Sequence, residues 1–193
     1  DMFRTLMKDV LGYEKFVAQG GDWGAFVTSR IGAAYPDDVF GIHLNLLAVP
    51  RENIDMSAPT DEEKVFFREL AHFLQEETGY QWIQGTKPQT LSYGLTDSPV
   101  GLAAWIVEKF RAWSDCDGDP ERAIPRDAML ANITIYWATG AINSSFWPYY
   151  ERRHAPSAVP GDAQIAAPMG YAAFPHEIVR PPRPAVDPRP ARD

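Results

Sequence analysis

The sequence contains a single cysteine, Cys116, and only four histidines. One thiol cannot form an internal disulfide, so nothing requires an oxidising compartment, and we predict a cytoplasmic location. The chain has no Cys-x-x-Cys pair and no histidine cluster, so we expect no structural metal and no cofactor. Cys116 lies in the polar stretch 114–121 (SDCDGDPE), where a surface thiol is expected.

The chain also has little positive charge and no long apolar run. Lys and Arg number 18 against 26 Asp and Glu, which leaves a net charge of −8. This balance argues against nucleic acid or an anionic membrane as a partner. No apolar run approaches the roughly 20 residues that cross a bilayer, so we expect no membrane segment in this chain. With 45% hydrophobic and 23% charged residues, the composition is that of a folded globular domain.

The clearest local signal is the stretch 15–36, KFVAQGGDWGAFVTSRIGAAYP. A short apolar strand pattern meets a glycine-rich turn, and a helical pattern follows at once. The turn has the small-x-acid-x-small form of a nucleophile elbow, with Asp22 where serine hydrolases carry Ser. Small residues are expected at Gly20 and Gly24 because the strand and helix backbones nearly touch there. The residue between them is expected to have a strained backbone that exposes its side chain. The Trp23 backbone N–H is a candidate oxyanion donor and the Trp23 ring a candidate pocket wall.

The rest of the pattern predicts an α/β fold with three parallel strands of a larger sheet and an all-helical lid insertion. Strands are expected at 15–19, 39–47 and 165–169, and helices at 2–11, 24–35, from Thr60, from Pro99, at 129–142 and at 149–153. The elbow helix is expected to turn Phe26, Val27, Ile31 and Ala34 toward the sheet. The domain limits predicted from this pattern are 1–48 and 162–182 for the core, 49–161 for the helical lid and 183–193 for a Pro-rich tail.

Six stretches, in chain order, resemble the epoxide hydrolases of the α/β-hydrolase fold, and most closely the microsomal-type branch with its bacterial and fungal relatives. They are QGGDWG (19–24), GIHLNLL (41–47), ETGYQWIQGTKPQTL (77–91), LTDSPVGLAAWIVEKF (95–110), NITIYWATGAINSS (132–145) and GYAAFPHEI (170–178). Six ordered matches from residue 10 to residue 180 argue against chance, whereas the elbow alone is only moderately specific.

The resemblance implies hydrolysis of a small apolar epoxide by water through a covalent intermediate, a detoxification chemistry. Asp22 is the implied nucleophile, and Tyr80 and Tyr149 are the implied hydrogen-bond donors to the epoxide oxygen. Tyr150 is the alternative position for the second tyrosine. Glu177 is the implied acid that orients a histidine, which activates the water that hydrolyses the ester.

The chain departs from this pattern after Glu177. The family carries its catalytic histidine in a Gly-Gly-His-Phe-type segment, and no such segment is present; His176 directly precedes the acid and does not match it. We therefore expect a chain that is inactive or limited to a single turnover. We interpret it as a central fragment whose tail arises from a frameshift or premature stop. The elbow strand is then expected to leave an unpaired edge, which predicts a homodimer.

Two alternatives stay open. The stretch 20–24 fits a haloalkane dehalogenase equally well, because that family shares the fold and the Asp nucleophile and carries a halide-binding Trp after it. The other alternative is a non-catalytic remnant that binds apolar ligands.

Overall fold

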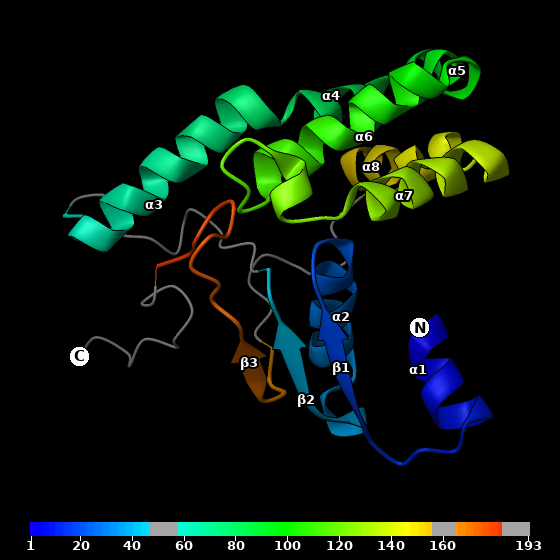
Figure 1. Ribbon diagram of the computed structural model, residues 1–193. Coiled ribbons are helices and arrows are strands. Elements are labelled where there is room, and N and C mark those ends of the chain that lie inside the picture. Colours follow the sequence, from blue (N-terminus) through cyan, green and yellow to red (C-terminus); the bar gives the residue numbers. More distant parts are fainter. Residues whose placement is uncertain (47–57, 156–164, 183–193) are drawn as a thin grey trace. The chain divides into compact units, whose positions relative to one another are not determined.

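The computed structural model describes residues 1–46, 58–155 and 165–182. The chain divides into two compact units, one formed by Asp1–Glu69, Ser157–Pro175 and Val179–Asp193, the other by Leu70–Pro156 and His176–Ile178 (Figure 1). The predicted tail and both predicted limits of the helical lid lie outside the described residues.

The first unit contains a parallel three-stranded sheet. Its strands are β1 (Phe16–Gly20), β2 (Val39–Leu44) and β3 (Met169–Tyr171), in the order β1-β2-β3. The predicted α/β class is confirmed. The third strand begins later than the predicted 165–169. Pro168 lacks an N–H group and contributes only its carbonyl, which accepts a hydrogen bond from the Ile42 N–H at 2.8 Å, so the regular ladder starts after it.

Helix α2 (Trp23–Ala34) follows β1 directly and packs on one face of the sheet (Figure 1). A 3₁₀ turn, η2 (Pro36–Asp38), then leads into β2, which completes the predicted strand–helix–strand unit. The predicted sheet-facing side of α2 is wrong in part. The helix buries Ala25, Thr28, Ile31 and Gly32, while Val27 is exposed. The buried face combines Ile31 with small residues, and at Gly32 a Cβ would lie only 3.1 Å from Ile42 Cδ1 on β2, so a larger side chain is not accommodated there.

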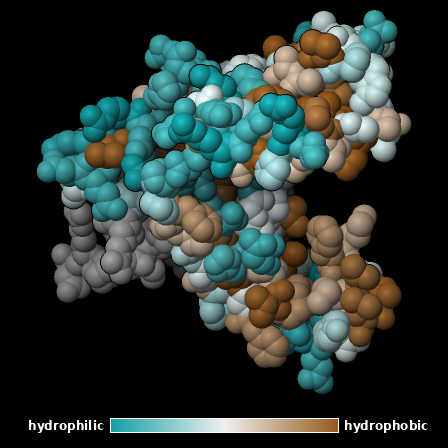
Figure 2. Space-filling view, in the orientation of Figure 1, coloured by the Kyte–Doolittle hydropathy of each residue, from teal (hydrophilic) through white to brown (hydrophobic). Residues whose placement is uncertain are grey.

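The predicted first helix is formed by α1 (Met2–Thr5) and a π-helical turn, η1 (Leu6–Val10). Most of its apolar side chains are exposed rather than packed, and Figure 2 shows hydrophobic residues gathered over α1 at the lower right. Asp38 anchors the segment: its carboxylate lies 2.7 Å from Arg4 Nε and 3.0 Å from Lys8 Nζ.

Every element described between residues 58 and 155 is helical. In order these are α3 (Asp61–His72), the π-helical turn η4 (Phe73–Glu77), α4 (Gly79–Thr86), α5 (Pro88–Asp97), α6 (Pro99–Trp113), the 3₁₀ turn η5 (Pro120–Arg122), α7 (Arg126–Thr139) and α8 (Ile142–His154). Two predicted helix starts are confirmed. Thr60 and Glu63 form a reciprocal capping box on α3, and the Ser98 hydroxyl accepts from the Gly101 N–H at 3.0 Å.

The second unit has its own apolar core, built from Leu95, Leu102, Ile133, Ile142 and Phe146. Helix α8 runs through Pro148 and is much longer than the predicted 149–153. Cys116 is buried rather than exposed, and its Sγ lies 3.3 Å from the Arg111 carbonyl oxygen. No helix among the described residues is both long and apolar enough to cross a membrane.

Candidate active site

The turn between β1 and α2 holds Asp22 in an unusual backbone conformation, with φ 44° and ψ −123°. This region favours glycine, so an Asp there is strained by roughly 1–3 kcal/mol. The side chain is exposed, as the elbow pattern predicts. The strained turn therefore presents one carboxylate at the carboxyl end of β1, at the start of α2.

Close contacts surround the two glycines before Asp22, from backbone at Gly20 and from the Asn45 side chain at Gly21. A Cβ on Gly20 would lie 2.1 Å from the Gly24 carbonyl oxygen, and one on Gly21 would lie 2.2 Å from Asn45 Oδ1. Gly24 differs from the prediction, because a Cβ there would meet nothing within 4 Å. The turn thus requires glycine at Gly20, where the neighbour is backbone. Asn45, directly after β2, is a neighbour of Gly21 that the sequence pattern did not indicate.

Two opposing effects act on the Asp22 carboxyl. Partial desolvation by the surrounding elbow raises its pKa, and a hydrogen bond from the Trp23 backbone N–H lowers it; desolvation is the larger effect. The group predicted as an oxyanion donor thus bonds the Asp22 carboxylate. Trp23 lines a pocket of about 340 Å³ together with Val17 and Val27.

In the second unit, Tyr80 on α4 and Tyr149 on α8 meet edge to face. Their ring centroids are 5.6 Å apart with an interplanar angle of 76°. The alternative, Tyr150, instead stacks on His154 at 4.1 Å. The structure therefore brings together the pair that the resemblance implies, Tyr80 with Tyr149.

A polar cluster supports Tyr80. Gln81 Nε2 donates to the Tyr80 hydroxyl oxygen at 2.9 Å, and the Trp113 ring contacts the Tyr80 ring at 5.3 Å. Lys109 Nζ lies 5.2 Å from the Tyr80 ring centroid and 3.3 Å from Glu77 Oε2. Sequence reasoning did not single out this cluster. The four-residue spacing of Lys109 and Trp113, which places both on one face of α6, was its only signal.

Glu177 is half-buried, and its Oε1 accepts a hydrogen bond from the Ile178 N–H at 2.9 Å. Its neighbour His176 is exposed, and its Nε2 lies 3.6 Å from Asp115 Oδ2. In the described part of the chain no histidine bonds Glu177. Asp22 belongs to the first unit, whereas Tyr80, Tyr149 and Glu177 belong to the second.

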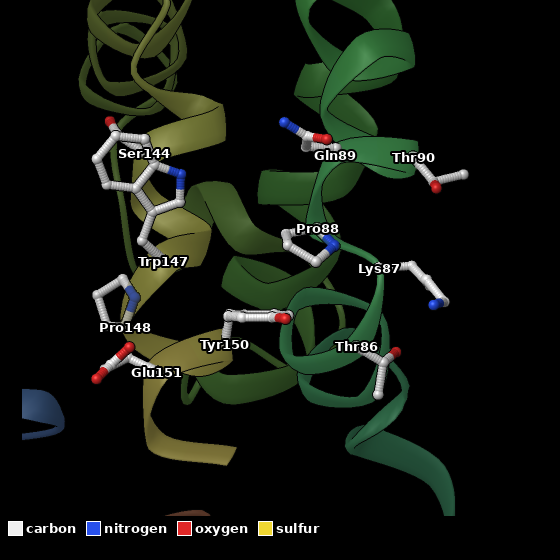
Figure 3. Close-up of a pocket in the computed structure, with 10 residues that line it drawn as sticks. All are labelled: Thr86, Lys87, Pro88, Gln89, Thr90, Ser144, Trp147, Pro148, Tyr150 and Glu151. Carbon is white, nitrogen blue, oxygen red and sulfur yellow. The ribbon is translucent and has the colours of Figure 1, made fainter. Parts of the chain in front are cut away.

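The helical unit also contains an open pocket of about 840 Å³, drawn in Figure 3. Its walls come from the α4–α5 junction and from α8, with the rings of Trp147, Pro88 and Tyr150 among them. Neither Tyr80 nor Tyr149 lines this pocket, so it is separate from the tyrosine pair. No group of three potential metal ligands occurs within 1–46, 58–155 and 165–182.

The known proteins that this chain resembles in sequence include epoxide hydrolases from a mammal and an insect. No known protein-family profile matches the chain. It is 36% identical over 196 residues to Epoxide hydrolase 1 of Oryctolagus cuniculus, covering 89% of this chain and 43% of that protein. It is 34% identical over 169 residues to the juvenile hormone epoxide hydrolase of Bombyx mori, covering 78% of this chain and 36% of that protein. The chain thus spans less than half the length of these relatives.

Solved structures of epoxide hydrolases also match the fold of this chain. The Aspergillus niger epoxide hydrolase matches with a TM-score of 0.78 and 29% identity, over 96% of this chain and 46% of that one. The structure of the Bombyx mori juvenile hormone epoxide hydrolase matches with a TM-score of 0.78 and 28% identity, over 96% of this chain and 48% of that one.

Proposed function

Because the chain is a relative of the epoxide hydrolases of the α/β-hydrolase fold, we propose that it performs the ring-opening half of epoxide hydrolysis, with Asp22 as nucleophile. The observation that carries this proposal is the elbow itself. The strained backbone at Asp22 exposes a carboxylate directly at the start of α2. An acid nucleophile suits attack on saturated carbon because no proton must be removed from it first.

In the proposed step, an Asp22 oxygen forms a bond to the less hindered epoxide carbon while the bond from that carbon to the ring oxygen breaks. The electron pair stays on the ring oxygen, which becomes an alkoxide and takes a proton from Tyr80 or Tyr149. Their edge-to-face contact supports this role, since the two phenol rings are direct neighbours. The substrates are a small apolar epoxide and water.

The second half, hydrolysis of the aspartyl ester, needs a general base. We propose that Glu177 orients a histidine in this step, as the resemblance implies. None of the four histidines lies in a Gly-Gly-His-Phe-type segment, so the 193-residue chain taken by itself is expected to accumulate the ester. Loss of one member of such a unit costs about 10⁴–10⁶ in turnover.

The test is incubation with an aryl epoxide followed by peptide mass analysis. One epoxide added to the Asp22 peptide is the expected result, and Asp22→Asn should abolish it. Asp117→Asn is a matched control, because Asp117 is also exposed and also has a positive φ, 48°, but lies outside the elbow. An unlabelled Asp22 peptide rejects the proposal, whereas steady diol production over many turnovers rejects only the single-turnover part.

Haloalkane dehalogenation remains the second candidate, because the Trp23 ring lines a pocket next to the elbow. Release of halide from a haloalkane, without reaction with epoxides, would favour it. The third candidate is a protein that only binds apolar ligands, which the exposed apolar side chains on α1 and β1 support. Ligand binding that is unchanged in Asp22→Ala would favour this candidate.

We also retain two proposals about the whole molecule. Within the described residues β1 pairs only with β2, and Val17 on β1 is 66% exposed, which supports a homodimer through the β1 edge. A molecular mass in solution equal to one chain would contradict it. The cytoplasmic location inferred from the single cysteine stays a prediction.

A further inference from the structure

We propose that Lys109 is a positioning residue for Tyr80, and that its charge strengthens the Tyr80 hydroxyl as a hydrogen-bond donor. Lys109 Nζ lies 5.2 Å from the centroid of the Tyr80 ring and 4.9 Å from that of Trp113. Both distances fall within the range of about 6 Å over which a cation is attracted to an aromatic face. One ammonium group thus contacts the two rings that pack against each other at this site.

Glu77 holds the ammonium group in place. A single oxygen, Oε2, accepts from Trp113 Nε1 at 2.9 Å and lies 3.3 Å from Lys109 Nζ. Glu77 ends η4, three residues before Tyr80, so these bonds tie the start of α4 to α6. The side chains of Lys109 and Glu77 are each only 22% exposed, which limits screening of their charges by solvent.

The hydrogen bonding of Tyr80 adds to the effect of the charge. Gln81 donates to the Tyr80 hydroxyl oxygen, so that oxygen already acts as a hydrogen-bond acceptor. A hydrogen bond to the oxygen and a nearby cation both favour negative charge on it. Both therefore make the O–H group a better donor to an alkoxide.

The carboxylates near Lys109 limit the size of the effect. Glu77 and Glu108 both pair with the ammonium group, Glu108 at 3.0 Å, and Tyr149 is the other titratable group that contacts the Tyr80 ring. Because the two carboxylates offset part of the lysine charge, we expect about a tenfold effect, below the roughly hundredfold loss for removal of a donor.

This inference rests on the proposed function, and its first test is the rate of Asp22 ester formation. Lys109→Met keeps the length and apolar stem of the side chain and should slow the reaction about tenfold. Lys109→Arg keeps the cation and should restore most of the rate. Lys64→Met removes an exposed lysine that pairs with Asp61 on the same turn of α3, and should react like the parent protein. A parent-like rate for Lys109→Met overturns the inference.

The second test does not depend on any reaction with epoxide. A fluorotyrosine placed at position 80 reports its own ionisation through its fluorine resonance. The midpoint should move to higher pH in Lys109→Met, because the phenolate loses a favourable charge, and to lower pH in Glu77→Gln, because an opposing charge is removed. Opposite shifts support the inference, and unchanged midpoints overturn it.

The two tests separate the possible failures. If the parent chain forms no ester at Asp22, the proposed function fails, while the fluorine titration still decides whether Lys109 acts on Tyr80. If Lys109→Met does not fold, as judged by its helical circular dichroism, Glu77→Gln and Lys109→Arg still give results of defined sign. A merely structural Lys109 would leave the Tyr80 midpoint unmoved in Lys109→Met.

Discussion

The rings of Tyr80 and Tyr149 meet edge to face, 5.6 Å apart, although they come from different helices, α4 and α8. Tyr150, the next residue after Tyr149, stacks on His154 instead. The α4–α8 packing therefore sets the contact between the two tyrosines to which the proposed chemistry assigns the donor role.

Removal of either hydroxyl should slow the ring-opening step. Tyr80→Phe and Tyr149→Phe are each expected to reduce the rate of Asp22 ester formation by about 10²-fold, because each removes a donor to the developing alkoxide. The rate is measured by mass analysis at a fixed epoxide concentration. Tyr93→Phe, at a position on α5 that is 73% exposed, is the control and should have no effect. Equal rates for all three variants would remove the tyrosines from the mechanism.

The elbow should not accept a side chain at Gly20. In Gly20→Ala the new Cβ would lie 2.1 Å from a backbone oxygen of Gly24, so the free energy of unfolding should fall by about 1–3 kcal/mol. Gly24→Ala is the matched control, because its Cβ meets nothing within 4 Å and alanine favours a helix by about 0.5–1 kcal/mol. Urea unfolding monitored by tryptophan fluorescence measures both. A Gly20→Ala protein as stable as Gly24→Ala would contradict the backbone contact.

The backbone strain at Asp22 should appear as a difference in the free energy of unfolding between two variants. Asp22→Gly and Asp22→Ala both remove the carboxylate, but only glycine adopts φ 44° without a steric cost. We expect Asp22→Gly to unfold with a free energy about 1 kcal/mol higher than Asp22→Ala. The comparison uses the same urea titration. If Asp22→Ala is the more stable of the two, the elbow is not strained.

On acidification, the rate of ester formation should fall at a higher pH than it would with a nucleophilic aspartate of ordinary pKa. Desolvation raises the pKa of Asp22 above 3.8, and the nucleophile is the ionised form. Ester formation should therefore fall as the pH drops through a midpoint above 3.8. The midpoint is read from initial rates over an acid pH series, and one at or below 3.8 would contradict the desolvated site.

The same shift has a consequence for stability. The folded protein binds the Asp22 proton more tightly than the unfolded chain does, so ionisation of Asp22 costs folding free energy above the raised pKa. Asp22→Asn should therefore be more stable than the parent near neutral pH, and this difference should disappear below about pH 3.8. Urea titrations at the two pH values measure it, and an unchanged difference at low pH would assign the gain to another cause.

Predictions from the sequence were accurate where structure depends on adjacent residues. The elbow strand and helix were placed within one residue of β1 and α2, and the caps at Thr60 and Ser98 form the expected hydrogen bonds. Each of these features follows from local backbone chemistry. Where the outcome depends on distant neighbours the predictions failed, as with the buried Cys116 and the sheet-facing side of α2.

The sequence by itself determined the strand–turn–helix that presents Asp22, because glycines and the strand and helix patterns around them restrict that backbone directly. It also carried the family resemblance. Only the tertiary structure decided which tyrosine meets Tyr80 and that Glu77, Lys109 and Trp113 gather around it. These contacts join separate helices, so their geometry is set by how the helices pack rather than by the spacing of residues along the chain.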